Sequence, residues 1–275
     1  MDPLTQGAFG AVLAQSVARR GETRFAAGVG AFAGLLADAD VLIRSSSDPL
    51  LTLEYHRHFT HSVFFVPIGA LLAALLLWPF LGSRLAFGRL YLFAFLGYSL
   101  SGVLDAFTSY GTHLFWPLSD QRVAWNLIAV VDPVFTLALL AASSVAAIKR
   151  MPRAAWFGLA FAGAYLLAGW VGQQRAEAVI RDLAGARGHE IERLLVKPTL
   201  GNLVLWRSLY ESDGVFHVDA VRVGLFSTRV YPGGSAPRAF PRRDLNALPR
   251  GSTTFLDAAR FHRFSDGYTH WHPER

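Results

Sequence analysis

The sequence predicts a mainly α-helical fold: a polytopic membrane helix bundle of about six helical segments with a small C-terminal α+β domain outside the membrane. Three observations predict it. Of the 275 residues, 52% are hydrophobic and only 17% are charged, and the mean hydropathy is positive at +0.32, whereas soluble domains carry about 25% charged residues. Apolar runs alternate with short polar connections over residues 1–173, the predicted membrane-embedded domain. From residue 174 to residue 275 charged and alternating patterns replace them.

The first two helices are predicted from apolar runs rich in small residues. Residues 4–18 and 25–36 are each shorter than the roughly 20 residues that a membrane span requires. We therefore expect them to pack as a hairpin within the bundle. Small residues allow helices to approach closely, and Gly28, Gly30 and Gly34 are the candidates for that contact.

The clearest membrane helix is predicted over residues 62–83, which contain no charge. Thr60 or Ser62 would cap its first turn. Three further apolar runs cover residues 90–104, 123–148 and 154–172. Asp132 precedes Pro133, and this pair predicts a helix start.

Beyond residue 173 the patterns predict a mixed domain. The segment 175–187 has the pattern of an amphipathic helix. Two strands, 203–210 and 215–223, are predicted to form a hairpin around a short polar turn. Proline and glycine predict a loop over residues 232–241, and a last short helix is predicted over residues 255–264.

The basic residues are distributed as membrane topology requires. The net charge is +6, but the arginines and lysine gather in every second connection, so they predict topology and no nucleic-acid partner. By the positive-inside rule, that side faces the cytoplasm. We expect the lipid bilayer as partner, with the acidic and histidine-rich connections and the C-terminal domain on the outer face. These basic residues are Arg19, Arg20, Arg24, Arg84, Arg89, Lys149, Arg150 and Arg153.

Metal-ligating residue types cluster at the ends of three apolar runs. They are Asp38 and Asp40, then His56, His58 and His61, then Asp105. Zinc binds imidazole and carboxylate, and a catalytic zinc activates water near neutral pH. Ionisable groups at the ends of membrane helices are usually functional. For any one residue a water-facing loop is the simpler interpretation; for the whole set on one side, a metal site is favoured. No cysteine is present, so thiolate ligands and a thiol nucleophile are excluded.

Several motifs resemble a known family. The stretches Met1-Asp2-Pro3-Leu4-Thr5-Gln6-Gly7-Ala8, Leu36-Ala37-Asp38-Ala39-Asp40, Tyr55-His56-Arg57-His58-Phe59-Thr60-His61-Ser62 and Leu104-Asp105-Ala106-Phe107-Thr108-Ser109-Tyr110-Gly111-Thr112 are similar to bacterial inner-membrane proteins that are predicted metal-dependent hydrolases. The resemblance covers most of the chain. It implies a divalent metal, zinc by preference, with these ligands: Asp40, His56, His61 and Asp105. Asp38 is then a further ligand or the neighbour of one.

One position departs from the family pattern. The family usually carries a histidine four residues before the aspartate of the last motif, where this chain has Ser101. Positions 101 and 105 share a helix face, so the two would be adjacent ligands. Serine binds zinc poorly, which puts the activity in doubt. His58 or His113 could supply the missing imidazole, or both could be surface residues of a wet loop.

These observations support two main functions. The first is a membrane-bound hydrolase in which metal-activated water attacks an ester or phosphoester, with a lipid-like molecule as the candidate substrate. Asp38 is the candidate general base; Arg57 either binds a phosphate oxygen or forms a structural ion pair. The alternative is a non-enzymatic, metal-stabilised membrane protein that presents its C-terminal domain for binding. A transporter is less well supported, because no internal repeat is visible.

Overall fold

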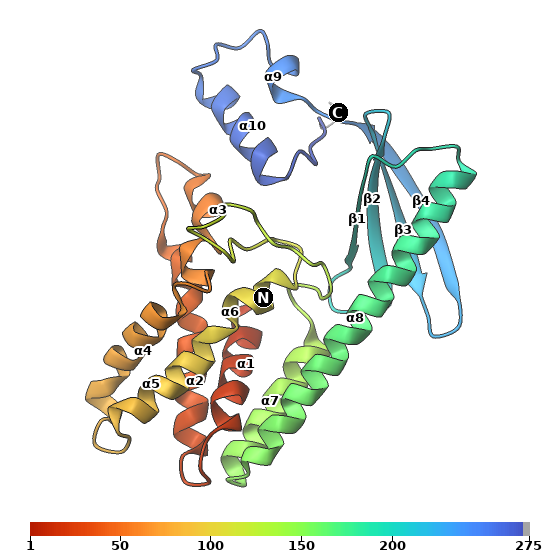
Figure 1. Ribbon diagram of the computed structural model, residues 1–275. Helices are drawn as coiled ribbons and strands as arrows, with labels where there is room; N and C mark the ends of the chain where they lie inside the picture. Colours follow the sequence, from red (N-terminus) through yellow and green to blue (C-terminus); the bar gives the residue numbers. More distant parts are fainter. Residues whose placement is uncertain (272–275) are drawn as a thin grey trace. The chain divides into compact units, whose positions relative to one another are not determined.

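The computed structural model describes residues 1–271, and its contacts divide the chain into two compact units (Figure 1). The first, here the helical unit, comprises Met1–Ile43, Tyr55–Gln173 and Lys197–Leu203. The second, here the sheet unit, comprises Arg44–Glu54, Gln174–Val196 and the chain from Val204 onward. The two units are thus interleaved along the sequence.

Helices dominate the described residues, as predicted. In chain order they are α1 (Pro3–Ser16), α2 (Thr23–Leu36), η1 (Ala37–Leu42), α3 (Leu51–Tyr55), η2 (Phe59–His61), α4 (Val66–Leu81), α5 (Phe87–Ser99), α6 (Ser101–Ala106), α7 (Pro133–Ile148), α8 (Pro152–Ala186), α9 (Pro241–Asp244) and α10 (Thr253–Phe264). In the helical unit α1 packs on α2, α5 and α7, and α4 packs on α2 and α5.

Three helical stretches in the described chain are long and apolar enough to cross a membrane: Thr23–Leu42, Phe87–Ala106 and Pro152–Ala186. A fourth span results if Leu51–His61 and Val66–Leu81, which meet at a 90° bend, are counted together. These candidate spans agree with a membrane protein, but six membrane spans are not shown.

The helix predicted to start near residue 62 begins at Val66 instead. Neither predicted capping side chain caps α4 itself, although Ser62 Oγ accepts from the Phe64 amide at 3.2 Å just before that helix begins. Thr60 Oγ1 donates a hydrogen bond to Asp40 Oδ2 at 2.7 Å, and Ser62 Oγ donates to the Trp116 carbonyl. The prediction at Asp132 is confirmed, since its side chain caps α7 by accepting from the Phe135 amide at 3.1 Å.

Two of the three predicted glycines make close helix contacts. A Cβ on Gly30 would collide with the carbonyl of Gly10, and one on Gly34 would lie 2.8 Å from the carbonyl of Gln6. The contact predicted at Gly28 is wrong, because nothing lies within 4 Å of a Cβ there. Backbone contact between α1 and α2 therefore depends on one face of α2.

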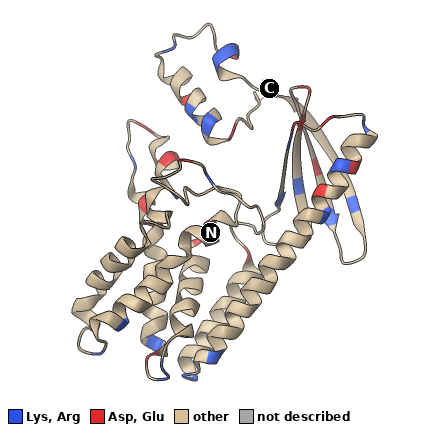
Figure 2. Cartoon of the chain, in the orientation of Figure 1, with Lys and Arg blue, Asp and Glu red and all other residues tan. Residues whose placement is uncertain are grey.

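The connections of the helical unit segregate by charge. The α1–α2, α4–α5 and α7–α8 turns lie together at one end of the helices, drawn at the bottom of Figure 1. Figure 2 shows Lys and Arg concentrated at this end. The segments η1, η2 and α6 lie at the opposite end, so the candidate ligands and the basic turns are at opposite ends.

The sheet unit contains a four-stranded antiparallel sheet in the order β1-β2-β3-β4, formed by Arg193–Pro198, Leu205–Ser212, Val215–Val223 and Thr228–Pro237. The predicted β2–β3 hairpin is confirmed. Its turn residues Asp213 and Gly214 have positive φ angles of 51° and 69°, as tight hairpin turns require.

Two predictions for the sheet unit are wrong in detail. The proline- and glycine-rich loop includes most of β4, which is an edge strand, where proline costs no ladder hydrogen bond. The amphipathic helix over 175–187 is the continuation of α8 rather than a separate element. Its apolar face packs into a core that includes Trp206 and Tyr210, which explains its amphipathic pattern. The last helix, α10, is confirmed.

Charge pairs join the elements of the sheet unit. Arg187 binds Asp219 through both guanidinium nitrogens at 2.7 and 3.0 Å. Burial acts to raise the pKa of Asp219, but the hydrogen bonds from Arg187 and the Gly233 amide, together with the charge of Arg187, lower the pKa overall. Arg260 of α10 reaches Asp48 and Glu54 at 2.8 and 2.7 Å, which attaches the 44–54 segment to α10.

The contrast between the glycines of α2 gives a stability test. Gly30→Ala should lower the free energy of unfolding by about 1–3 kcal/mol, because its methyl group forces the α1 and α2 backbones apart. Gly28→Ala is the matched control and should be neutral or stabilising, since alanine favours helix by about 1 kcal/mol over glycine. The check is the apparent Tm of each purified variant in detergent; equal melting of Gly30→Ala and wild type would contradict the close contact.

Candidate metal centre

Three segments bring acidic and histidine side chains together at one end of the helical unit. Asp38 and Asp40 lie on η1, where α2 tightens into a 3₁₀ turn. His56 follows α3, and His61 ends η2. Asp105 lies on α6, at the end of the Phe87–Ala106 span. His56 thus lies in a loop and His61 on a short helical turn.

Arg57 shapes the loop between the two histidines. Its φ angle is 61°, a left-handed conformation that is uncommon for a residue with a side chain. In this conformation its amide donates to Asp40 Oδ2 at 2.8 Å, and its carbonyl accepts from the His113 amide at 3.0 Å. These two bonds hold the reversed chain in place.

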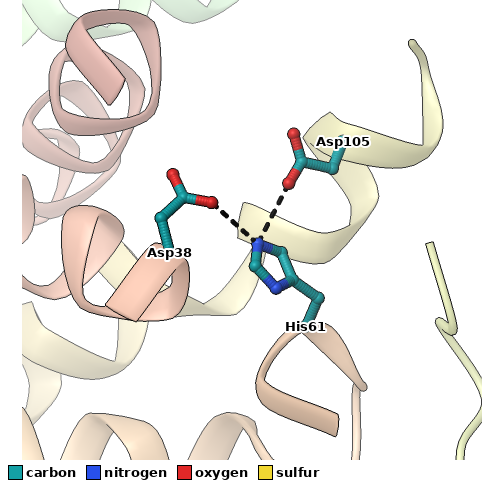
Figure 3. A group of neighbouring side chains, drawn as sticks. All are labelled: Asp38, His61 and Asp105. Atoms are coloured by element: carbon teal, nitrogen blue, oxygen red, sulfur yellow. Dashed lines mark ion pairs between the residues drawn. The ribbon is translucent and has the colours of Figure 1, made fainter. Parts of the chain in front are cut away.

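The first group consists of Asp38, His61 and Asp105 (Figure 3). His61 Nε2 lies 3.2 Å from Asp38 Oδ1 and 3.0 Å from Asp105 Oδ2. The His61 and Asp105 side chains are fully buried, and that of Asp38 is 13% exposed. Among the described residues none of these three atoms has a hydrogen-bond partner. Two carboxylate oxygens and one imidazole nitrogen therefore face one another, and Arg57 Nε, 3.3 Å from Asp105 Oδ2, balances part of their charge.

Such an arrangement suits a cation. Burying an unsatisfied polar atom costs about 1–3 kcal/mol, and more when the group is charged. Three buried ligand atoms that converge in this way are unfavourable unless a positive charge lies among them. One imidazole and two carboxylates form a donor set that zinc accepts, and three protein ligands are typical of catalytic zinc sites. The residues thus fit the implied metal.

Asp40 occupies a different place from Asp38. Its Oδ2 lies 3.2 Å from His61 Nδ1 and accepts from Thr60 Oγ1 and the Arg57 amide, while its Oδ1 lies 2.8 Å from His56 Nδ1. Asp38, Asp40 and His56 make up the second group of metal-ligating types. Four partners occupy the oxygens of Asp40. A carboxylate on the far nitrogen of a metal-binding histidine orients that ring.

Arg57 is the main cationic side chain at the site. It is 3% exposed, its Nε lies 3.3 Å from Asp105 Oδ2, and its Nη1 donates to Thr108 Oγ1 at 2.9 Å. Its guanidinium carbon lies 4.9 Å from the centre of the Tyr110 ring. These buried contacts include an ion pair with Asp105, which is one of the two roles that the sequence leaves open for Arg57.

Two contacts in the site were not anticipated from the sequence. The amino group of Met1 contacts Asp105 Oδ1, and Thr60 bridges Asp40 and His61, since its Oγ1 also lies 3.0 Å from His61 Nδ1. Thr60 was assigned a capping role. Its position directly before a ligand histidine was the signal available in the sequence.

His58 and His113 contact each other rather than the two groups. Their ring centres are 4.4 Å apart. Burial, followed by the neighbouring His58 and Arg122, lowers the pKa of His113 to about 4, so His113 is neutral at pH 7. Ser101 is buried on α6, and its hydroxyl has no partner in the described part of the chain. Neither imidazole belongs to a metal-ligating group with Asp105.

Comparison with known proteins follows the same part of the chain. A sequence of Bacillus subtilis (strain 168), the uncharacterized protein YfhP, is 26% identical over 186 residues. The alignment covers 66% of this chain and 54% of YfhP, so this chain spans about half the length of that relative. No solved structure matches.

The membrane helices and the candidate site together lie within a matched family profile. The profile of the YdjM inner membrane protein family matches residues 1–176. Its description names the inner membrane and no reaction, in agreement with the candidate spans. Because the match covers more than half of the sequence, the chain belongs to the YdjM inner membrane protein family.

Proposed function

We propose that this protein is a metal-dependent hydrolase of the bacterial cytoplasmic membrane, with a divalent cation, zinc by preference, held by Asp38, His61 and Asp105. The observation that supports the proposal is the convergence of three buried atoms, Asp38 Oδ1, His61 Nε2 and Asp105 Oδ2, that have no hydrogen-bond partner among the described residues. When bound, the cation would supply Lewis-acid activation of water for attack on an ester.

The remaining residues take supporting roles in this proposal. Asp40 orients His61 through Nδ1. Because Asp38 is needed as a donor, the base role passes from Asp38 to His56, whose Nδ1 faces Asp40 and whose side chain is 22% exposed. Arg57 orients Asp105 through its 3.3 Å contact.

The proposed substrate is an ester or phosphoester with a lipid-like portion. The site lies at the end of the Phe87–Ala106 candidate span, and the exposed apolar side chains of α4 include Ile68, Leu72 and Leu75. A substrate dissolved in the bilayer could approach such a site. The same segregation of charge supports an outer-face site, since the basic turns lie at the opposite end of the helices.

A non-enzymatic role remains the second candidate. Ser101 stands where the related pattern has a ligand histidine, and its hydroxyl is buried near Asp105. Arg57 already balances part of the acidic charge. In this alternative the cation stabilises the end of the bundle and the sheet unit binds a partner. Bound metal without hydrolysis of any carboxyl- or phosphoester in a panel would favour it.

The donor set gives the first test. Asp38→Asn keeps the shape but removes the charge, so metal content measured by elemental analysis should fall from about one ion per chain to near zero, and ester hydrolysis should fall with it. Asp120→Asn, in an exposed loop, is the matched control and should keep its metal. Wild-type protein purified without chelators that carries no divalent metal would refute the proposal.

The orienting role of Asp40 gives a separate test. Asp40→Asn should retain the site but weaken metal affinity by about 10–100-fold, as loss of a histidine-orienting carboxylate does elsewhere. Competition with a chelating dye measures this affinity. Complete loss of metal at saturating concentration would instead make Asp40 a direct ligand, as the family resemblance implied.

The outer-face orientation can be tested with single cysteines, because the chain has none. In intact cells a membrane-impermeant maleimide should label Ser46→Cys. The matched Gly21→Cys, in the basic α1–α2 turn, should react only after permeabilisation. If only membrane-permeant reagents label Ser46→Cys, the proposed orientation is wrong and this segment faces the cytoplasm.

A further inference from the structure

The β3–β4 turn of the sheet unit exposes two large apolar side chains. Leu225 is 87% exposed and Phe226 is 99% exposed, the highest values among the exposed large hydrophobic residues of the described chain. The turn is closed by the Gly224 amide, which donates to the Ser227 carbonyl at 2.8 Å. Figure 1 shows this turn at the end of the sheet opposite the β2–β3 turn. A leucine and a phenylalanine exposed at a turn tip lower solubility, and such exposed apolar side chains mark a surface that binds a protein or a membrane.

Arginines flank this tip on one face of the sheet. Arg222 of β3 is the direct cross-strand partner of Arg229 of β4. Arg207 of β2 is paired with Ala220 and shares the outer face with Arg222, since side chains alternate along strands. Figure 2 shows basic residues on these strands. Like charges directly opposite each other destabilise a sheet.

No carboxylate compensates these charges within the described residues. Arg229 lies against the ring of Tyr231, with its guanidinium carbon 5.3 Å from the ring centre, but no ion pair joins Arg207, Arg222 or Arg229 to an acidic residue of the described chain. Elsewhere in the same unit Arg187, Arg193, Arg238 and Arg260 all have carboxylate partners. Arg207, Arg222 and Arg229 thus form a group of arginines without carboxylate partners among the described residues, on the face beside the apolar tip.

A cavity of about 370 Å³ lies between the cross-strand arginines and the turn. Arg222, Gly224, Ser227, Thr228 and Arg229 line it. Guanidinium forks bind phosphate oxygens in bidentate fashion, and the two hydroxyls are further donors. The cavity therefore suits a phosphate group, and the tip next to it suits an apolar phase.

We propose that the β3–β4 turn docks on a bilayer surface that contains anionic phospholipids. Leu225 and Phe226 enter the acyl region, and Arg222 and Arg229 share a lipid phosphate in the cavity. Surface-seeking segments combine apolar insertion with basic attraction in this way. The bilayer is at high local concentration, because α8 is a candidate span that leads directly into the sheet unit. The proposal does not depend on the metal site.

The test uses the full chain in nanodiscs, with the environment-sensitive dye NBD on a single cysteine. On Phe226→Cys in discs containing phosphatidylglycerol, the NBD emission should shift to the blue and be quenched by lipid-borne nitroxide. On Asp213→Cys, in the turn at the other end of β3, the dye should stay in water. Equal emission and quenching at the two positions would overturn the proposal.

Three further comparisons test the headgroup contact. Added to the labelled chain, Arg222→Gln with Arg229→Gln should abolish the blue shift, whereas Arg242→Gln with Arg250→Gln, an equal loss of charge at exposed positions, should preserve it. Pure phosphatidylcholine discs should give a much smaller shift. Free inorganic phosphate should compete only weakly, because it lacks the apolar portion. An unchanged shift in the Arg222/Arg229 pair, or equal shifts in both lipids, would overturn the phosphate site.

Discussion

The helical unit depends on how one buried acidic cluster is compensated. Asp38, Asp40 and Asp105 surround His61 at the end of helices that are otherwise apolar. Carboxylates in such surroundings repel one another and lose hydration, and each loss is costly unless a cation or a set of donors replaces the water. Asp40 has four partners, whereas Asp38 Oδ1, His61 Nε2 and Asp105 Oδ2 have no hydrogen-bond partner among the described residues. A resident cation is the simplest way to satisfy them.

That requirement explains several local features together. Arg57 adopts a left-handed backbone conformation, and its amide reaches Asp40 while its guanidinium reaches Asp105. The α4 helix starts at Val66 rather than near residue 62, and the hydroxyls of Thr60 and Ser62 both donate to acceptors outside that helix. Strain and lost caps of this kind persist at sites that the surrounding structure holds in place. They suggest that the loop is built for the site rather than for the helix that follows it.

Much of this was predictable from sequence, and what was not has physical causes. Apolar runs and charge alternation gave the helical character, Asp132 gave a helix start, and the polar turn gave the β2–β3 hairpin. The predicted site residues do gather at one end of the helical unit. Their roles could not be derived, because spacing does not reveal which nitrogen of His61 faces which carboxylate.

The strand β4 was not predicted, because proline signals a loop unless the strand is known to be at an edge. The continuity of α8 beyond residue 173 was not predicted, because the apolar face of this extension packs against residues that lie much later in the sequence. The two units interleave along the sequence because of contacts between distant segments, which composition does not reveal. The single domain boundary at residue 173 stays a prediction.

We infer that His61, Asp38 and Asp105 share one divalent ion. X-ray absorption spectroscopy at the zinc edge on purified, zinc-loaded protein tests it most directly, because it reports the donor atoms without any assumption about the substrate. A shared ion should give a single class of zinc with light-atom donors at about 2.0–2.2 Å and the scattering of one imidazole ring. Zinc that washes out on desalting, or a spectrum without imidazole scattering, would contradict it.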